Sequence, residues 1–179
     1  QKEYLFSPCW KAQPCEGHKV LARLEQRGII KAVITQNIDN LHHRAGSYKV
    51  IEVHGNIREC ICLKCGAVRP INTEDIAPRC TKCDLVMKPN CTLFEEDLPK
   101  DAWKAAVEEM NAADIVLIIG TSGEVFPAAN LPGLSVCHGG KLIVINPSPS
   151  RFDTMARIMI GMSACKGLKA IEEELSFNE

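Results

Sequence analysis

The chain has 179 residues, 46% of them apolar, with 21 basic and 22 acidic side chains. This length suits one domain with a small insertion, and it is enough to bury a core without disulfides. The balanced charge argues against proteins that bind nucleic acids or membranes through an excess of Lys and Arg, so neither kind of partner is expected.

The longest apolar run, 115–119, is far shorter than the roughly 20 residues that span a bilayer, and the first residues show no signal-peptide pattern. The sequence therefore predicts a soluble protein of the cytoplasm. The chain has ten cysteines, and in a reducing compartment they favour metal binding or thiol chemistry over a disulfide framework.

Helices and strands alternate along most of the chain. Residues 17–27 have apolar side chains at helical spacing and end at Gly28, which predicts a helix. The β-branched run 29–35 predicts a strand buried on both faces, and a short helix N-capped by Asp39 and ended by Gly46 follows it. Further strands are predicted at 50–53, 115–119 and 142–145, and further helices from Pro99, within 127–134 and at 164–175.

This alternation predicts an α/β fold with a doubly wound, mostly parallel, Rossmann-like sheet. Residues 58–91 interrupt the pattern, because they are rich in Cys, Lys, Pro and Asn and contain few large apolar residues. That segment needs a cross-link to fold. We therefore expect a Rossmann-like domain made of 1–57 and 92–179, and a small zinc-ribbon insertion at 58–91.

The insertion contains two Cys-x2-Cys pairs, Cys62 with Cys65 and Cys80 with Cys83, separated by fourteen residues. Each pair can present two thiolates to one ion, and two pairs complete a tetrahedral site with no vacant position for a catalytic water. The spacing predicts a structural Zn²⁺ site, and the alternatives are a redox dithiol or a metal-free ribbon. Cys60 is interpreted as a spare thiol or a competing ligand, and the remaining cysteines are expected to need no special chemistry.

Polar residues follow four of the predicted strands. Ligands of open α/β sheets bind beyond the carboxyl ends of the strands, so side chains at these ends can converge. The tripeptide 120–122 (Gly-Thr-Ser) could cradle a phosphate with its backbone N–H groups, although an ordinary strand-to-helix turn has the same composition. The residues at the four ends are Gln36, Asn37 and Asp39; His54; Gly120, Thr121 and Ser122; and Asn146.

His54 is the candidate base at these strand ends. A histidine after an apolar strand is often structural, but Asn37 and Asp39 at the adjacent strand end favour a role in chemistry, where a neutral imidazole accepts a proton from a sugar hydroxyl. The other histidines are interpreted as structural or solvent-exposed residues: His18, His42, His43 and His138.

Together these segments resemble the sirtuin family of NAD-dependent protein deacylases. The resemblance covers nearly the whole chain in the same order. It implies NAD as co-substrate, Zn²⁺ as metal and an acylated-lysine protein or peptide as partner, with release of nicotinamide and O-acyl-ADP-ribose. The matching motifs are 35–42 (Thr-Gln-Asn-Ile-Asp-Asn-Leu-His), His54-Gly55, the two cysteine pairs, 88–90 (Lys-Pro-Asn), 120–122, 127–129 (Pro-Ala-Ala) and 145–146 (Ile-Asn).

The resemblance also implies a role for each site residue. His54 would be the general base that activates a hydroxyl of the nicotinamide ribose. Asn37 would hold that ribose with Gln36 beside it, and Ile38 and Asp39 would line the nicotinamide pocket. The remaining assignments are Gly120, Thr121 and Ser122 to the phosphates and adjoining ribose, Asn146 to the adenosine ribose, and Thr92, Phe94, Glu95 and Glu124 to the substrate.

The chain departs from the family pattern in three places. Family members carry Phe-Gly-Glu where this chain has Phe94-Glu95-Glu96, and the added carboxylate could select a basic peptide or exclude peptides. Gly123 and Glu124 stand where the family prefers apolar residues. No Gly-x-Gly loop precedes Gly17, so the Gly-Ala-Gly NAD-binding segment is expected to be missing. These departures leave two alternatives: a catalytically impaired zinc module that binds NAD or ADP-ribose, and a protein ADP-ribosyltransferase.

Overall fold

Two parallel sheets form the centre of the protein in the computed structural model, which describes residues 7–72, 77–93 and 95–177. The first sheet pairs β1 (Val33–Thr35) with β2 (Val50–Glu52), and the second has the order β6 (Ile115–Ile119), β7 (Lys141–Ile145), β8 (Ala156–Ile160). The predicted α/β class with mostly parallel pairing is confirmed, with the parallel strands divided between two sheets.

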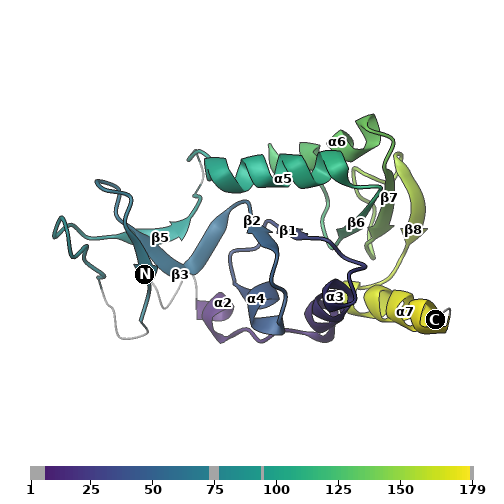
Figure 1. Ribbon diagram of the computed structural model, residues 1–179, viewed down its shortest axis with the longest axis horizontal. Coiled ribbons are helices and arrows are strands. Elements are labelled where there is room, and N and C mark those ends of the chain that lie inside the picture. Colours follow the sequence, from purple (N-terminus) through teal and green to yellow (C-terminus); the bar gives the residue numbers. More distant parts are fainter. Residues whose placement is uncertain (1–6, 73–76, 94, 178–179) are drawn as a thin grey trace.

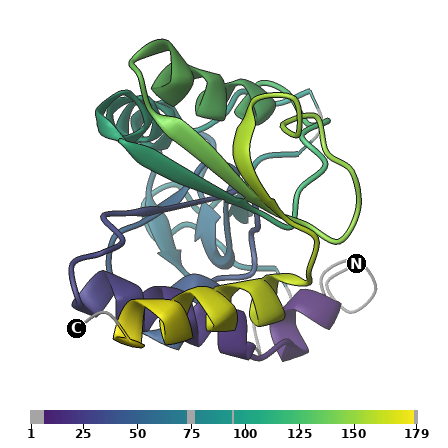
Figure 2. The same ribbon diagram turned by 90° about the vertical axis from the view of Figure 1, so that its right-hand side faces the viewer.

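Helices cover both sides of these strands and make a three-layer arrangement (Figure 1, Figure 2). One layer contains α5 (Lys100–Ala112), a 3-10 turn (Ala128–Asn130) and α6 (Leu131–Cys137). The opposite layer contains α3 (Glu16–Gln26) and α7 (Ala164–Phe177). The described residues also contain two short helices, α2 (Ser7–Lys11) and α4 (Leu41–Ala45). Within the described ranges, no helix is both long and apolar enough to cross a bilayer.

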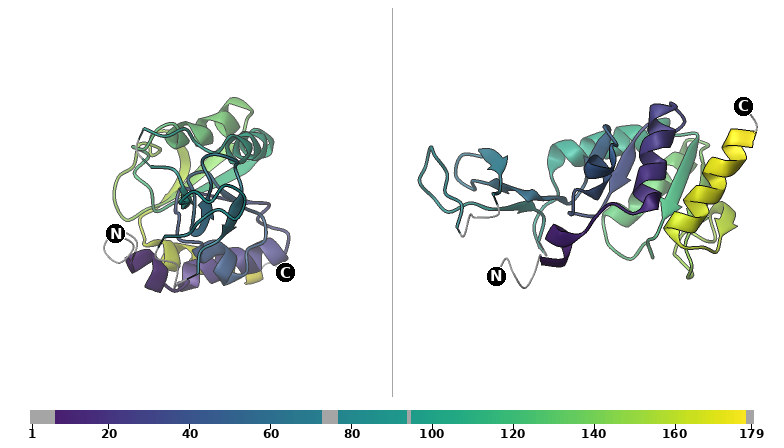
Figure 3. Two further views of the ribbon diagram at one scale, coloured as in Figure 1. Left: turned by 90° about the vertical axis from the view of Figure 1, so that its left-hand side faces the viewer. Right: turned by 90° about the horizontal axis from the view of Figure 1, so that it is seen from below.

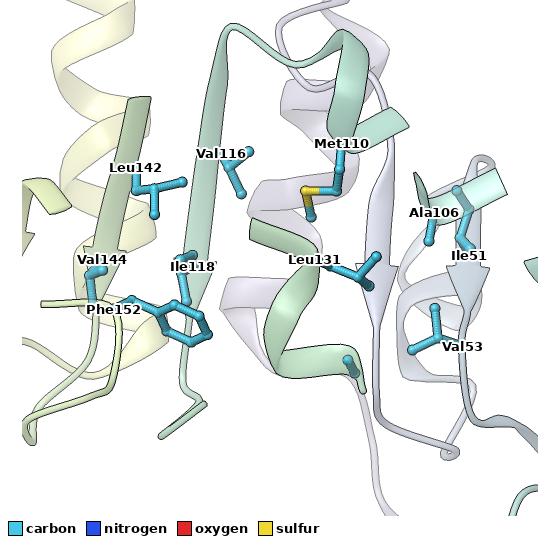
Figure 4. Close-up of a cluster of buried hydrophobic side chains, with 11 residues drawn as sticks. Ile51, Val53, Ala106, Met110, Val116, Ile118, Leu131, Leu142, Val144 and Phe152 are labelled. Carbon is cyan, nitrogen blue, oxygen red and sulfur yellow. The ribbon is translucent and has the colours of Figure 1, made fainter. Parts of the chain in front are cut away.

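The main hydrophobic core lies between the strands and the α5–α6 layer (Figure 4). The predicted apolar face of the helix after Pro99 is confirmed, since Ala106 and Met110 are buried and Trp103 packs against them. A second cluster joins Leu24 of α3 and Leu168 of α7 to Ile145 of β7. Buried apolar side chains therefore attach the helices to the sheets, and this burial is the main stabilising contribution in a chain of this composition.

A small antiparallel sheet projects from one end of the molecule (Figure 1, Figure 3). Its strands are β3 (Gly55–Ile61), β4 (Val68–Pro70) and β5 (Lys88–Cys91), in the order β4-β3-β5. Cys60, Ile71 and Met87 form a separate cluster of buried side chains beside it. This cluster is small, as the composition of 58–91 predicts.

Two local predictions need correction, and strand β8 is an addition to the predicted elements. The strand predicted at 29–35 is formed only by Val33–Thr35, and Ile29 is 42% exposed. The N-cap of α4 is Asn40, at φ 64°, while the carboxylate of Asp39 accepts the N–H of Leu41 at 3.0 Å. Asp39 therefore still binds a free N–H at the start of the helix, as capping side chains do, but from one position earlier. Strand β8 was not predicted at all.

Candidate active site and metal centre

The imidazole of His54 is held in one tautomer by the end of the neighbouring strand. Its Nδ1 lies 3.0 Å from the carbonyl oxygen of Gln36. Because a carbonyl can only accept, Nδ1 carries the hydrogen and Nε2 of the neutral ring has a free lone pair. His54 is half-buried, and its bond to the Gln36 carbonyl fixes the orientation of the ring and therefore the direction of the Nε2 lone pair. This is the arrangement that a general base needs.

The loop after β1 is fastened to the segment that contains His54. The N–H of Val53 donates to the Thr35 carbonyl at 3.1 Å, and that of Ile57 donates to the Ile38 carbonyl at 2.9 Å. The hydroxyl of Thr35 also accepts the N–H of Asn37 at 3.1 Å. The predicted group of Gln36, Asn37, Ile38 and Asp39 therefore lies beside His54, and the side chain of Asn37 is exposed.

A second group forms where β6 and β7 end. The N–H of Gly120 donates to the Ile145 carbonyl at 3.0 Å, and the side-chain amide of Asn146 lies 3.4 Å from the Thr121 carbonyl. The N–H of Arg151 donates to the Ser122 carbonyl at 2.9 Å. These bonds join the loops that follow the two strands. A cavity of about 220 Å³ beside Asn146 is lined by Ser148, Asp153 and Gly161, among others.

Both groups lie at the same end of their strands. Figure 4 shows this through the pairs Ile51–Val53, Val116–Ile118 and Leu142–Val144, in which the later residue of each pair lies lower. Gly120 and Asn146 directly follow β6 and β7, and His54 lies two residues after the end of β2. The predicted convergence at the carboxyl ends of parallel strands is therefore consistent with the observed strand directions.

The second group has features that suit a dinucleotide. Gly120 is exposed, and a Cβ added there would have no atom within 4 Å, so its backbone faces open space. A phosphate can approach such a backbone closely. Asn146 offers an amide beside it, and the exposed Asn37 offers another at the first group. The described residues thus fit parts of a nucleotide at both groups.

The predicted substrate residues are only partly described. The N–H of Thr92 donates to the carbonyl oxygen of His54 at 2.8 Å, which places Thr92 next to the candidate base. Glu95 and Glu124 are exposed, and Phe94 lies outside the described residues. Glu95 has φ 68°, so it adopts a left-handed backbone at the position where the family carries glycine.

The four predicted metal ligands come together in the small sheet. The sulfur atoms of Cys62, Cys65, Cys80 and Cys83 all lie within 4.8 Å of one another, and those of Cys65 and Cys80 are 3.6 Å apart. Tetrahedral Zn–S bonds of about 2.3 Å place sulfur atoms about 3.8 Å apart, so this donor set fits Zn²⁺. Cys60 is not in the group; it is buried with its sulfur 3.8 Å from that of Met87.

Each cysteine pair is folded by the same two backbone bonds. The N–H of Cys62 donates to the Ala67 carbonyl and its own carbonyl accepts from Gly66, while Cys80 makes the equivalent bonds with Leu85 and Asp84. Backbone N–H groups of Cys65 and Lys64 donate to the Cys62 sulfur and lower the pKa of this thiol to about 7. The hydrogen bond with Cys65, together with burial, raises the pKa of Cys83 to about 12. Cys62 therefore loses its proton readily, whereas Cys83 must give up its proton when a metal binds.

The metal centre is remote from the candidate base. His54 directly precedes β3 and Cys62 directly follows it, and β3 has seven residues. At about 3.3 Å per residue, this strand separates the two by roughly 23 Å. Four thiolates also leave no open position for a substrate. A metal bound to these four cysteines would therefore hold the small sheet together and have no contact with the candidate base.

Two features of the structure were not predicted from the sequence. The sulfur atoms of Cys15 and Cys165 are in contact, although these cysteines were expected to need no special chemistry. Buried Glu25 accepts the N–H groups of Tyr48 and Lys49, which fixes the start of β2 and so the position of His54. No local pattern reveals either contact, because the partners are far apart in sequence.

The chain was also compared with known proteins. The family model described as "Sir2 family" matches residues 2–127. NAD-dependent protein deacylase 2 of Pyrobaculum aerophilum is 40% identical over 168 residues, which cover 93% of this chain and 68% of that protein. NAD-dependent protein deacetylase of Thermotoga maritima is 39% identical over 180 residues, 97% of this chain and 72% of the relative.

Solved structures agree with these relatives. One described as "Sir2 bound to acetylated peptide" has a TM-score of 0.87 and 38% identity, covering 98% of this chain and 76% of that chain. Another, "Sir2-p53 peptide-NAD+", has a TM-score of 0.87 and 37% identity, with the same coverage of 98% and 76%. By sequence and by structure, the chain belongs to the Sir2 family, the sirtuins.

Proposed function

We propose that this chain is an NAD-dependent protein deacylase that removes acetyl or related acyl groups from lysine side chains. The relatives are NAD-dependent deacetylases and deacylases by name, and a similar structure contains an acetylated peptide. The observation that carries the proposal is the fixed tautomer of His54, whose Nδ1 faces the Gln36 carbonyl and whose Nε2 is a free acceptor.

In this proposal His54 works as a general base. Its Nε2 takes the proton of a ribose hydroxyl, and the Gln36 carbonyl stabilises the resulting imidazolium by keeping its bond to Nδ1–H. NAD, when bound, supplies nicotinamide as the leaving group and the ribose that accepts the acyl oxygen. Asn37 and Gln36 would hold the nicotinamide ribose, and Ile38 and Asp39 the nicotinamide itself. Gly120, Thr121 and Ser122 would hold the phosphates and adjoining ribose, and Asn146 the adenosine ribose.

We also propose that the chain is organised as residues 1–57 and 92–179 for NAD binding and 58–91 for zinc binding. Cys62, Cys65, Cys80 and Cys83 would hold Zn²⁺ through their sulfur atoms. Since these thiols must be reduced to bind a metal, a cytoplasmic location suits the protein.

The peptide-binding side of the site points to basic substrates. Thr92 lies next to His54 through its N–H, and Glu95 and Glu124 bring exposed carboxylates to the loops assigned to the substrate. Negative charge at this position favours peptides with Lys or Arg near the acylated lysine. We propose that Thr92, Phe94, Glu95 and Glu124 contact the peptide.

Release of nicotinamide from NAD in the presence of an acetyl-lysine peptide tests the function. We expect His54→Ala to reduce the rate by roughly 10²- to 10⁴-fold, the usual contribution of a positioned base. His138→Ala is the matched control, because His138 is an exposed histidine that bonds the Leu134 carbonyl.

Three results would contradict the proposal. Equal rates for His54→Ala and the unchanged chain would exclude His54 as the base. Binding of ADP-ribose without any nicotinamide release would favour the impaired module, and transfer of label from NAD to protein with little deacylation would favour ADP-ribosyl transfer.

A further inference from the structure

Cys15 and Cys165 hold their sulfur atoms 3.0 Å apart, although 150 residues separate them in the sequence. Both are free thiols, Cys15 exposed and Cys165 half-buried. Since sulfur atoms in a disulfide are about 2.05 Å apart, a bond here needs a movement of roughly 1 Å in all. Neither residue belongs to the zinc cluster or to the candidate active site.

The two helices that carry these cysteines are fixed against each other. Cys15 is the N-cap of α3, and Cys165 lies in the first turn of α7. The N–H of Gly17 points to the Cys165 sulfur at 3.4 Å, and a Cβ at Gly17 would lie only 3.4 Å from that atom. Further along, Arg23 makes two bonds of 2.7 Å to Glu172. The contact between the sulfur atoms is therefore part of a packed interface.

A base stands beside the exposed thiol. The Nδ1 of His18 lies 3.1 Å from the Cys15 sulfur, and it also accepts the backbone N–H of Cys15 at 3.3 Å. An acceptor nitrogen carries no hydrogen, so the lone pair of Nδ1, which the backbone N–H and the thiol share, can take the thiol proton. Burial lowers the pKa of His18, which keeps the ring neutral at pH 7.

The two thiols also differ in pKa. Burial opposes ionisation of Cys15, but the Cys165 thiol and the backbone N–H groups of His18 and Gly17 outweigh it and lower the pKa of Cys15. The hydrogen bond to Cys15 raises the pKa of Cys165. A low-pKa, exposed sulfur beside a second thiol is the arrangement of a nucleophile and a resolving cysteine.

We propose that Cys15 and Cys165 are a site of reversible oxidation, at which a hydroperoxide converts the two thiols into an intramolecular disulfide. The Cys15 thiolate, its proton transferred to His18, attacks one oxygen of hydrogen peroxide; the O–O bond breaks and the leaving oxygen takes the proton and departs as water. The Cys165 sulfur then attacks the sulfenic sulfur of Cys15, the S–O bond breaks and a second water leaves with the Cys165 proton. Two thiols are oxidised and one peroxide is reduced.

The disulfide would join the first helix packed on the sheets to the last. It closes a loop of about 150 residues, so it restricts the unfolded chain far more than the folded one. The oxidised chain should therefore unfold at a temperature roughly 5–15 °C higher than the reduced chain.

Peroxide treatment of the reduced, zinc-loaded chain tests the proposal. Trypsin releases Cys15 in peptide 12–19 and Cys165 in peptide 158–166. We expect mass spectrometry to show these two peptides linked, two hydrogen masses below their sum, together with the rise in Tm. Dithiothreitol should reverse both changes.

Variants separate this site from general thiol oxidation. Cys15→Ser and Cys165→Ser should each abolish the linked peptides and the rise in Tm, whereas Cys137→Ser, at another exposed cysteine, should leave both unchanged. The proposal is overturned if peptides 12–19 and 158–166 stay unlinked while Cys137 is oxidised in the same sample. If the disulfide between Cys15 and Cys165 forms as fast in His18→Gln as in the unchanged chain, the assignment of His18 as the base is overturned.

Discussion

Replacing Gly55 with alanine tests how closely β5 packs against the residue that follows His54. Gly55 has φ +73°, and a Cβ there would lie 2.2 Å from the Asn90 carbonyl oxygen and 3.0 Å from the Cys91 Cα. Both contacts are with the backbone of β5, which pairs with β3 at Gly55 and Cys91. Rotation of a side chain cannot relieve them, so the strands must separate or the turn must change.

The expected loss of stability has two parts. A left-handed backbone costs an alanine roughly 1–2 kcal/mol, and forcing an extra methyl group against packed atoms costs roughly 1–3 kcal/mol more. We therefore expect Gly55→Ala to lower the free energy of unfolding by about 2–5 kcal/mol. For a chain of this length the corresponding fall in Tm is roughly 5–15 °C.

A comparison of the thermal unfolding of Gly55→Ala and Gly28→Ala separates the cost of the left-handed backbone from the cost of the contact with β5. Gly28 has nearly the same backbone, with φ +72°, but a Cβ there would meet nothing within 4 Å. Gly28→Ala should therefore show only the backbone cost, about 1–2 kcal/mol. Equal losses for the two variants would refute the close approach of β5 to Gly55 and, with it, the argument that β5 supports the position of His54.

Three further predictions follow from local features. Glu95→Gly should raise Tm by roughly 1–4 °C, because it relieves the left-handed backbone at φ 68°; a lower Tm would contradict this. The pKa of His42 is lowered to about 4 from 6.5 by burial and by His18, so the unfolded chain binds the proton first. The free energy of unfolding should then fall by roughly 3 kcal/mol between pH 7 and pH 4, less steeply in His42→Gln, as denaturant titrations can show. Cys62→Ser should abolish one bound zinc per chain in metal analysis, and Cys91→Ser, at a buried thiol outside the cluster, should not.

Patterns within a short segment predicted much of this structure. Helix α5 was predicted from apolar residues three and four apart, and two of them, Ala106 and Met110, are buried. The metal cluster was predicted from spacing alone, because a Cys-x2-Cys pair is itself a folded unit whose two backbone bonds the structure shows. His54 was predicted as a base from its place after a strand together with Asn37 and Asp39 at the adjacent strand end, and this role stays a prediction. For the helix and for each cysteine pair, the information lies within a few neighbouring residues.

Features set by distant partners could not be predicted in this way. Strand β8 has mostly exposed side chains and is defined by its pairing with β7, so its sequence lacks a buried pattern. Asn40 adopts a left-handed backbone. Asparagine tolerates this conformation but does not require it, so the residue type alone does not place the N-cap there. The contact of Cys15 with Cys165 depends on how α3 and α7 pack, which no local periodicity encodes.

The small sheet connects the cysteine cluster to the candidate active site, although the two lie far apart. Strand β3 begins directly after His54 and ends directly before Cys62, and the Thr92 N–H that follows β5 bonds the His54 carbonyl. Because β5 pairs with both ends of β3, at Gly55–Asn56 and at Cys60–Ile61, the backbone on both sides of His54 depends on the same sheet that the four sulfur atoms would hold together when they bind a metal. A metal in the cluster, roughly 23 Å along β3 from His54, can therefore influence this candidate base only through the position of its imidazole.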